Sequence, residues 1–262
     1  MFQRGLITVG WLVAFSFCFS PVQAQQHQAK TNTLRPVVIE TATVLPEGQA
    51  AFDLGLAMEL DREVGGGGGR EYDNLRVAPV ALRYGVSSGM EIGAAIGYSD
   101  NDAEGLNGPD ESGLEGISLF AKLQLNPESA VRFGLVMAGD DNIAPYPNDG
   151  VDVFVNLALQ KPLAKGVLFG ELGYRAQGGD LDMNNYFNYG VGFATAVAET
   201  VGLSLELVGE QAQDIGIGNS LDLVLGAGLQ LGDGVRMAPY VSVGLNDAGP
   251  DLAAGGQLEL RL

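Results

Sequence analysis

Hydrophobic and polar residues alternate with a period of two along most of the chain. In the stretch GISLFAKLQLNPESAVRFGLVMAG, residues 116–139, one phase of 117–125 is apolar, whereas the other holds Ser118, Lys122 and Gln124. Successive side chains of a β-strand point to opposite faces, so this period predicts strands. NPES, at 126–129, has the composition of a turn. The stretch therefore predicts a β-hairpin with one apolar and one mixed face, which both soluble sandwiches and membrane barrels contain.

The same alternation recurs about twelve times. The apolar phases run through residues 52–60, 78–84, 90–98, 117–125, 131–137, 151–159, 168–174, 187–197, 201–207, 221–229, 241–245 and 252–262. One segment is irregular, because Leu75 and Val77 fall on the phase opposite to Val80 and Leu82. Pro79 lies between them and predicts a bulge there, since proline cannot donate to a strand ladder.

The links between these segments alternate in length. Short links occupy residues 85–89, 126–129, 161–166, 198–200 and 232–234, and longer ones occupy 61–73, 100–112, 139–150, 177–185, 211–218 and 246–250. Outer-membrane barrels combine short periplasmic turns with longer outside loops and an even number of strands. A soluble sandwich has no reason to alternate in this way. The sequence therefore predicts an all-β fold, a transmembrane antiparallel up-and-down β-barrel of about 12 strands of the outer-membrane type, with both termini in the periplasm.

The N-terminal residues predict export. Arg4 precedes an apolar run from Leu6 to Phe19, and the chain then reaches Val-Gln-Ala24, so residues 1–24 are expected to be a signal peptide that is cleaved after Ala24. The alternative is a membrane anchor, but this run is shorter than the roughly 20 residues that a spanning helix needs. Residues 25–48 are expected to form a periplasmic N-terminal segment and residues 49–262 the barrel. The expected location is the outer membrane of a Gram-negative cell.

Charge narrows the range of partners. The chain has 14 basic and 32 acidic residues, a net charge of −18, which argues against nucleic acid. Much of the negative excess falls in the longer links, where divalent cations can bridge acidic side chains to anionic lipopolysaccharide. SDNDAEG at 99–105 and GDDN at 139–142 lack the spacing of an EF-hand, so solvated acidic loops are expected and no metal or cofactor is predicted. GGGGG at 65–69 lacks the lysine of a phosphate loop and is expected to be a loop tip.

Parity assigns the two faces of the barrel. A charge on the lipid face costs a few kcal/mol near the membrane midplane, so the charged phase is expected to line the lumen. The lumen-lining candidates are Asp53, Glu59, Arg83, Glu91, Lys122, Arg132, Asp152, Glu171, Arg175, Glu206, Glu210, Asp222, Arg236, Glu259 and Arg261.

Lys122 and Arg132 face each other across the short NPES turn. Two like charges this close need an acidic partner, for which Glu91 and Asp152 on the neighbouring strands are the candidates. The pair is also the best candidate for a site that an anion enters. The alternative is an internal network of ion pairs that holds the barrel and closes its lumen.

Catalysis is not expected. His27, the only histidine, lies well before the first predicted strand, so a Ser-His pair has no base. The one cysteine, Cys18, lies in the predicted signal peptide, so the mature chain is expected to contain no thiol and no disulfide.

Three phrases resemble the family of outer-membrane transporters labelled "putative MetA-pathway of phenol degradation". They are TATVLPEGQAAFDLGLAMELDRE (41–63), APVALRYGVSSGMEIGAAIGYSD (78–100) and SVGLNDAGPDLAAGGQLELRL (242–262). The resemblance implies an outer-membrane barrel associated with the passage of aromatic or other small compounds, and it implies no ligand residues. Such barrels commonly end in an aromatic residue, whereas this chain ends in Leu262.

The sequence therefore predicts a porin-like barrel for passive or facilitated passage of small solutes. The competing hypothesis is a closed barrel with a structural or surface-interaction role. Conductance in a planar bilayer separates the two.

Overall fold

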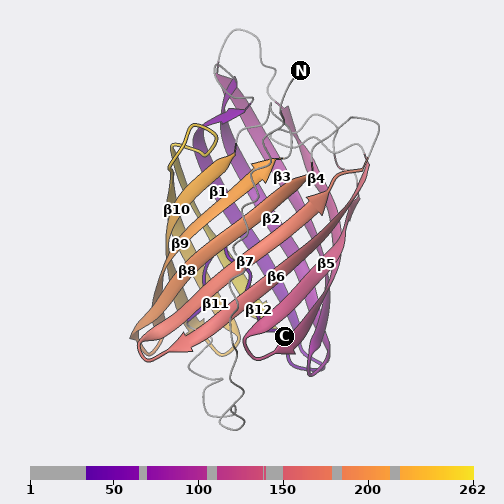
Figure 1. Ribbon diagram of the computed structural model, residues 1–262, viewed down its shortest axis with the longest axis vertical. Helices are drawn as coiled ribbons and strands as arrows, with labels where there is room; N and C mark the ends of the chain where they lie inside the picture. The colour runs from indigo at the N-terminus through magenta and orange to yellow at the C-terminus, as the bar shows by residue number, and fades with distance from the viewer. Residues whose placement is uncertain are drawn as a thin grey trace, which may run out of the picture.

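The computed structural model describes residues 34–64, 70–104, 111–137, 139, 150–178, 185–212 and 219–262. Its twelve strands are β1 (Ala50–Val64), β2 (Arg70–Ser87), β3 (Met90–Glu104), β4 (Glu111–Asn126), β5 (Ser129–Met137), β6 (Val151–Leu163), β7 (Gly166–Ala176), β8 (Tyr186–Ala198), β9 (Val201–Ala212), β10 (Ser220–Gly232), β11 (Val235–Gly244) and β12 (Leu252–Arg261). Each strand pairs with its sequence neighbours, and β1 pairs with β12, so the sheet closes into a barrel (Figure 1). The predicted fold class is confirmed.

The outer wall of the barrel is apolar. Leu56 on β1, Leu172 on β7, Leu205 on β9 and Leu225 on β10 each expose more than half of their surface. Exposed apolar side chains on so many strands are uncommon on soluble monomers and are typical of surfaces that meet lipid or a partner. These residues belong to the phase that the sequence analysis assigned to lipid. In the part of the chain that the structure describes, no helix has the length and apolar character needed to cross a membrane.

Strand β2 contains the irregularity predicted at Pro79. The register with β3 shifts between Val77 and Val80, and the register with β1 shifts between Leu54 and Ala57. Leu75 and Leu82 lie seven positions apart, yet both face outward, with 48% and 56% of their surface exposed. The outward-facing residues of β2 are therefore odd-numbered before the irregularity and even-numbered after it, so the apolar residues on both sides of Pro79 face outward.

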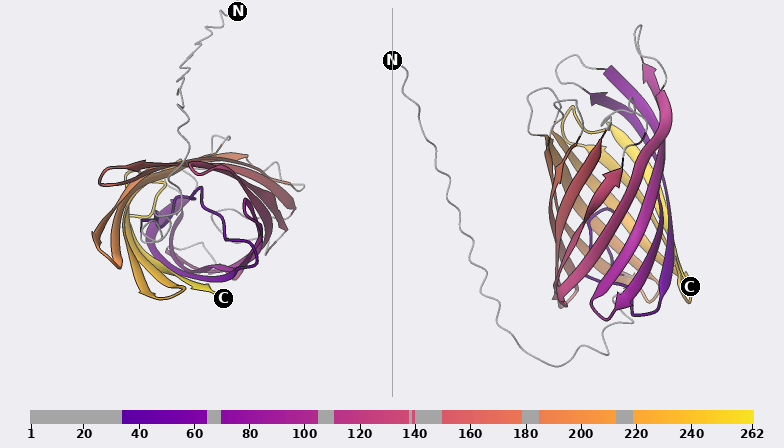
Figure 2. Two further views of the ribbon diagram at one scale, coloured as in Figure 1. Left: turned by 90° about the horizontal axis from the view of Figure 1, so that it is seen from below. Right: turned by 90° about the vertical axis from the view of Figure 1, so that its right-hand side faces the viewer.

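Residues 34–48 run through the lower part of the lumen. Viewed from below, this stretch follows the inside of the wall (Figure 2). Val37, Ile39, Ala42, Val44 and Leu45 are all buried, and Ile39 packs against Val167, Phe169 and Ala194 in a small core. The sequence predicted a periplasmic lead-in ahead of the barrel; the described part instead lies inside it. We call residues 34–48 the lumen segment.

Candidate functional site

The lumen segment is held through its backbone by one buried carboxylate of β9. Glu206 accepts hydrogen bonds from the amides of Val37 (2.6 Å), Val38 (2.9 Å) and Ile39 (3.0 Å), and from the hydroxyl of Ser204 (2.8 Å). Only 1% of Glu206 is exposed. An extended segment without a sheet partner leaves its N–H groups unpaired, which is costly when they are buried. Glu206 thus replaces the ladder that this part of the chain lacks.

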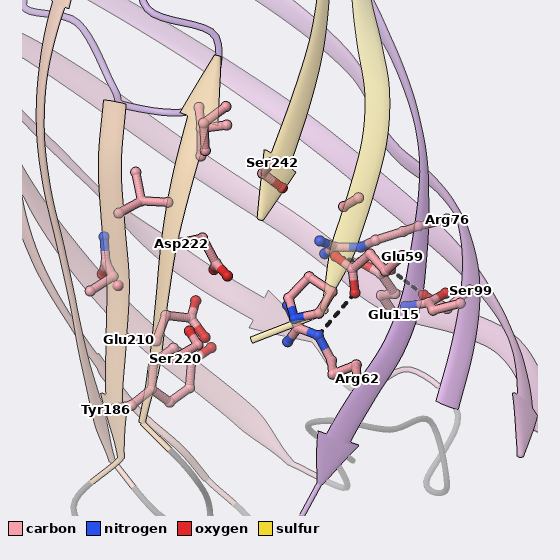
Figure 3. A pocket seen from close by; sticks show the side chains of 18 of the residues that line it. Glu59, Arg62, Arg76, Ser99, Glu115, Tyr186, Glu210, Ser220, Asp222 and Ser242 are labelled. Atoms are coloured by element: carbon pink, nitrogen blue, oxygen red, sulfur yellow. Dashed lines mark hydrogen bonds and ion pairs between the residues drawn. The ribbon is translucent and has the colours of Figure 1, made fainter. Parts of the chain in front are cut away.

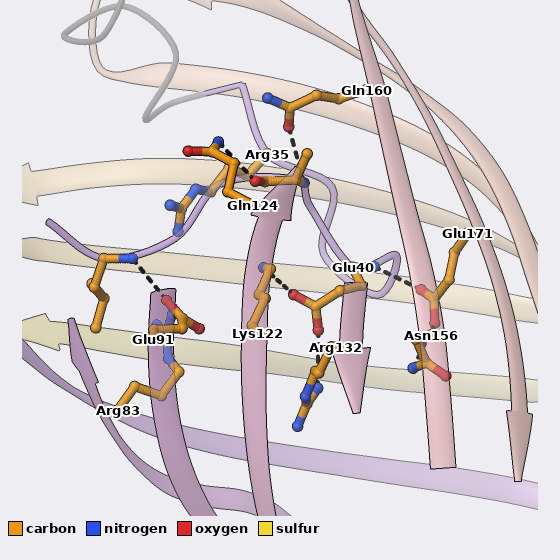
Figure 4. Close-up of polar contacts among 12 residues, drawn as sticks. Arg35, Glu40, Arg83, Glu91, Lys122, Gln124, Arg132, Asn156, Gln160 and Glu171 are labelled. Carbon is orange, nitrogen blue, oxygen red and sulfur yellow. Dashed lines mark hydrogen bonds and ion pairs between the residues drawn. The ribbon is translucent and has the colours of Figure 1, made fainter. Parts of the chain in front are cut away.

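Polar side chains of four further strands hold the rest of the lumen segment (Figure 4). Glu171 on β7 accepts from the Glu40 amide at 2.7 Å, and Glu91 on β3 accepts from the Leu45 amide at 2.7 Å. The Ala42 amide donates to the Gln160 side chain on β6, and the Ala42 carbonyl accepts from Gln124 on β4. The anchors come from well-separated parts of the wall, so the lumen segment crosses the barrel interior.

Glu40 is the acidic partner of the basic pair. Its carboxylate lies 2.6 Å from the Lys122 ammonium and 2.9 Å from the Arg132 guanidinium (Figure 4). Burial would raise the pKa of this carboxyl, but the two cations outweigh burial and hold its pKa well below its ordinary value. Glu40 is therefore ionised at neutral pH. Lys122 is only 2% exposed, so Glu40 is the carboxylate that compensates a buried ammonium.

Glycines of the inner wall make room for the lumen segment, as two of them show. A Cβ atom at Gly226 on β10 overlaps the side chain of Val37, and one at Gly192 on β8 lies 3.0 Å from Cδ1 of Ile39. A larger residue at either position pushes against the segment, whose backbone is held close to this part of the wall by Glu206 on the intervening strand β9. The wall is therefore shaped to receive this segment.

Gly226→Ala is expected to weaken docking of the lumen segment by about 1–3 kcal/mol, the usual cost of overpacking a closely packed site. The reporter is a cysteine at Ala42, which is fully buried, in the mature chain that is expected to contain no other cysteine. A hydrophilic maleimide should label this cysteine faster in the variant. Gly232→Ala, on the same strand with open space around it, is the matched control and should leave the rate unchanged. Equal rates in all three proteins contradict the contact.

Three arginines contact one carboxylate near the lower end of β12. Glu259 contacts Arg35 of the lumen segment (3.0 Å), Arg83 (2.8 Å) and Arg261 (2.8 Å), and Arg83 also binds Asp53 at 2.6 Å. Arg236 on β11 lies opposite Glu259 in the strand register. This cluster ties the start of the lumen segment to the seam where the barrel closes.

Above the lumen segment lies a cavity of about 390 Å³, which we call the outer vestibule (Figure 3). Asp222, Glu210, Ser220 and Tyr186 come from one side of it, and Arg62, Arg76, Glu59, Glu115 and Ser99 come from the other. Arg62 pairs with Glu59 at 3.0 Å, and Arg76 pairs with Glu115, which also accepts from Ser99. The vestibule is thus a polar chamber whose walls differ in charge.

A second cavity of about 350 Å³, the lower cavity, lies between the lumen segment and the wall formed by β1 to β5, β11 and β12. It is lined by Arg83, Lys122, Arg132 and Arg236, with Phe120, Pro79 and Ala95 between them. The Arg132 guanidinium stacks over the Phe120 ring at 3.9 Å. Val38 lines both this cavity and the outer vestibule, so the two chambers adjoin at this residue of the lumen segment.

The structure places the candidates of the sequence analysis in three groups. The outer vestibule receives Glu59, Glu171, Arg175, Glu210 and Asp222, and Asp152 binds Arg175 beside it at 2.5 Å. The lower cavity receives Asp53, Arg83, Glu91, Lys122, Arg132, Arg236 and Glu259. Glu206 and Arg261 contact the lumen segment and Glu259, respectively. Glu91 lies opposite Lys122 in the register, but it binds Leu45 and lies 3.6 Å from Arg83.

Sequence reasoning missed five charged residues of these chambers. Arg35 and Glu40 lie in the stretch interpreted as a lead-in. Arg76 precedes the irregularity at Pro79, and Glu115 precedes Gly116, whose φ is +103° and where the register with β3 shifts. Both therefore fall on the parity assigned to lipid. Arg62 follows Asp61, whose φ is +52°, at another register shift. Pro79 and Gly116, which interrupt the strand alternation, were the sequence signal that the neighbouring charged residues could face the lumen.

Several sequence expectations fall outside the described residues. These are the signal peptide, His27, the GGGGG stretch and most of the acidic links. Among the residues that are described, no group of three or more His, Cys, Asp or Glu side chains is arranged to hold a metal ion.

Comparisons with solved structures agree on the fold. The chain is similar to an outer membrane channel from Pseudomonas putida F1, with a TM-score of 0.68 and 14% identity over 87% of this chain and 100% of that one. It is also similar to a deltaS2 mutant of the monoaromatic hydrocarbon channel TodX, with a TM-score of 0.50 and 11% identity over 89% of this chain and 96% of that one. A third similar structure is the translocator domain of the autotransporter NalP from Neisseria meningitidis, with a TM-score of 0.50 and 12% identity over 83% of this chain and 88% of that one. No protein-family model and no curated protein matches the chain. At these identities the likeness establishes a membrane β-barrel fold.

Proposed function

We propose that this protein is an outer-membrane channel of a Gram-negative cell, through which small solutes pass between the outer vestibule and the lower cavity. The observation that carries the proposal is that two polar chambers lie next to each other in the lumen and share Val38 in their lining. The lumen segment narrows this path to the space that it leaves beside the wall. Twelve strands enclose more room than the eight of a side-chain-filled barrel, and here the segment occupies part of that room.

The placement in the membrane follows from the outer surface. The apolar band meets lipid, and the end with the short turns faces the periplasm, as in outer-membrane barrels. Residues 1–24 direct export and are removed. Cell fractionation and N-terminal sequencing of the mature protein test this placement: the protein should be in the outer membrane and begin at Gln25.

The solutes we infer are small and include aromatic compounds. The two chambers, about 390 and 350 Å³, are of the size that holds a single small molecule. Aromatic rings line both, Tyr186 and Tyr240 in the vestibule and Phe120 in the lower cavity. The resemblance to the phenol-degradation family and the likeness to a monoaromatic hydrocarbon channel support the same class of solute.

One observation favours the alternative, a closed structural barrel. The lumen segment contacts opposite sides of the lower lumen, and its charged groups are paired with those of the wall. Such a network is also what a permanently sealed barrel requires.

Conductance in a planar bilayer decides between the two. We expect the purified mature protein to give small, discrete single-channel currents, because the lumen segment leaves only a narrow path beside it. Folding is checked by the heat-dependent migration that intact barrels show on SDS gels. Correctly folded protein that gives no channels contradicts the channel and supports the sealed barrel.

A further inference from the structure

Arg236 is a buried cation without a carboxylate partner. The residue is buried, with only 7% of its surface exposed. Its Nη2 donates to the Arg35 carbonyl at 3.3 Å, and its Nε has no partner among the residues that the structure describes. No described carboxylate lies within ion-pair distance of it. Buried guanidinium groups normally bind a carboxylate or phosphate, because an unpaired buried charge is expensive.

The nearest carboxylate in the strand register is already occupied. Glu259 lies opposite Arg236, but its Oε2 binds Arg35 and Arg83 and its Oε1 binds Arg261. Glu206, on β9 beyond the intervening strand β10, is occupied by three backbone amides of the lumen segment. The carboxylates of the wall thus bind the other arginines and the amides of the lumen segment, and they leave Arg236 without a carboxylate.

The open space beside Arg236 is the lower cavity. It is lined by five cationic side chains, Arg35, Arg83, Lys122, Arg132 and Arg236, and by four carboxylates, Glu40, Asp53, Glu91 and Glu259. One positive charge is therefore unmatched. The Nε of Arg132 also has no hydrogen-bond partner among the described atoms. Both orphan groups are donors, so the cavity lacks an acceptor that carries a single negative charge.

The rest of the lining suits an apolar body. Pro79, Ala81, Ala95 and Phe120 come from the barrel wall, and Val37 and Ile39 come from the lumen segment. A volume of about 350 Å³ lies at the small end of ligand sites and exceeds what an inorganic anion fills. A planar carboxylate matches the fork of donors on a guanidinium, while its hydrocarbon part contacts the apolar wall.

We propose that the lower cavity binds a small organic monocarboxylate, with its carboxylate on Arg236 and its apolar body against Phe120 and the wall of β2 and β3. This inference rests on the proposed function and narrows it, because it gives one class of solute for the path past Val38. Arg236 acts as the charge-selective contact of that path.

Isothermal titration of the full mature barrel in detergent tests the site, with benzoate as the probe and benzamide as its neutral counterpart of similar shape. Benzoate should bind and benzamide should bind at least tenfold more weakly, since only benzoate brings the charged acceptor that the guanidinium lacks. Arg236→Gln should weaken benzoate binding about tenfold or more, and Arg236→Lys should retain part of it. Lys161→Gln removes a positive charge from an exposed position near the same end of the barrel and should have no effect.

Equal affinity for benzoate and benzamide overturns the proposal, as does unchanged benzoate binding in a folded Arg236→Gln variant. Absence of measurable benzoate binding to the wild type also overturns it. If Arg236→Gln does not fold, the comparison of benzoate with benzamide on the wild type decides alone. Binding in detergent requires no open path, so its outcome is independent of the conductance experiment. A channel that conducts without binding benzoate refutes only this site.

Discussion

Glu40→Ala should lower the free energy of unfolding by roughly 3–5 kcal/mol, the cost of leaving a buried charge without its partner. Lys122 is 2% exposed, and its ammonium lies 2.6 Å from the Glu40 carboxylate. Glu91, opposite Lys122 in the register, is engaged by the Leu45 amide and does not replace Glu40. The measurement is denaturant unfolding of the mature barrel in lipid vesicles.

A double variant separates the lost partner from a general effect of the substitution. Combining Glu40→Ala with Lys122→Met removes both charges, and most of the lost stability should return, because no buried ammonium remains. Glu47→Ala is the matched control, an exposed carboxylate in the same segment, and should change stability by less than about 0.5 kcal/mol. Equal effects of Glu40→Ala and Glu47→Ala contradict the buried ion pair.

Deleting residues 35–45 should raise single-channel conductance severalfold. The deletion removes the part of the lumen segment that Glu206, Glu171 and Glu91 hold, and so joins the space it occupied to both cavities. The twelve strands and their pairing do not depend on this stretch, so the barrel itself should persist. The measurement is single-channel recording in planar bilayers beside the wild type.

A replacement of the same length provides the control for the deletion. Gly-Ser residues at 35–45 keep the connection to β1 but lack the side chains that bind the wall, and they should also increase the current and its fluctuations. Folding of both variants is checked by heat-dependent gel migration. If both fold and conduct as the wild type does, the lumen segment does not limit the path.

The barrel could be predicted from the sequence because its signals are local and repeated. Period-two alternation fixes the strands, and alternating link lengths fix the up-and-down order. The outer face imposes the same alternation of apolar and polar residues on strand after strand, so one misassigned segment does not change the result. Even the irregularity at Pro79 was predictable, because proline lacks the donor that a ladder requires.

The site was only partly predictable, because its partners are distant in sequence. Alternation placed Lys122 and Arg132 on the lumen side and indicated that they need an acid. It could not show that Glu40, 82 residues before Lys122, returns into the barrel to supply it. Residues 34–48 carry no period, since they form no ladder, and their backbone groups bind side chains of six different strands. Glycines on the inner face, such as those at 192 and 226, are a sequence trace of the segment that packs there.

A cysteine at Val38 tests the central claim most directly, because Val38 lines both cavities and is 46% exposed. Single-channel current through the Val38→Cys protein should fall sharply when a bulky charged thiol reagent is added, since the adduct fills the point where the chambers adjoin. A cysteine at the exposed Glu47 position should react without reducing the current as much. Complete labelling at position 38 with an unchanged current contradicts a path that runs past the lumen segment.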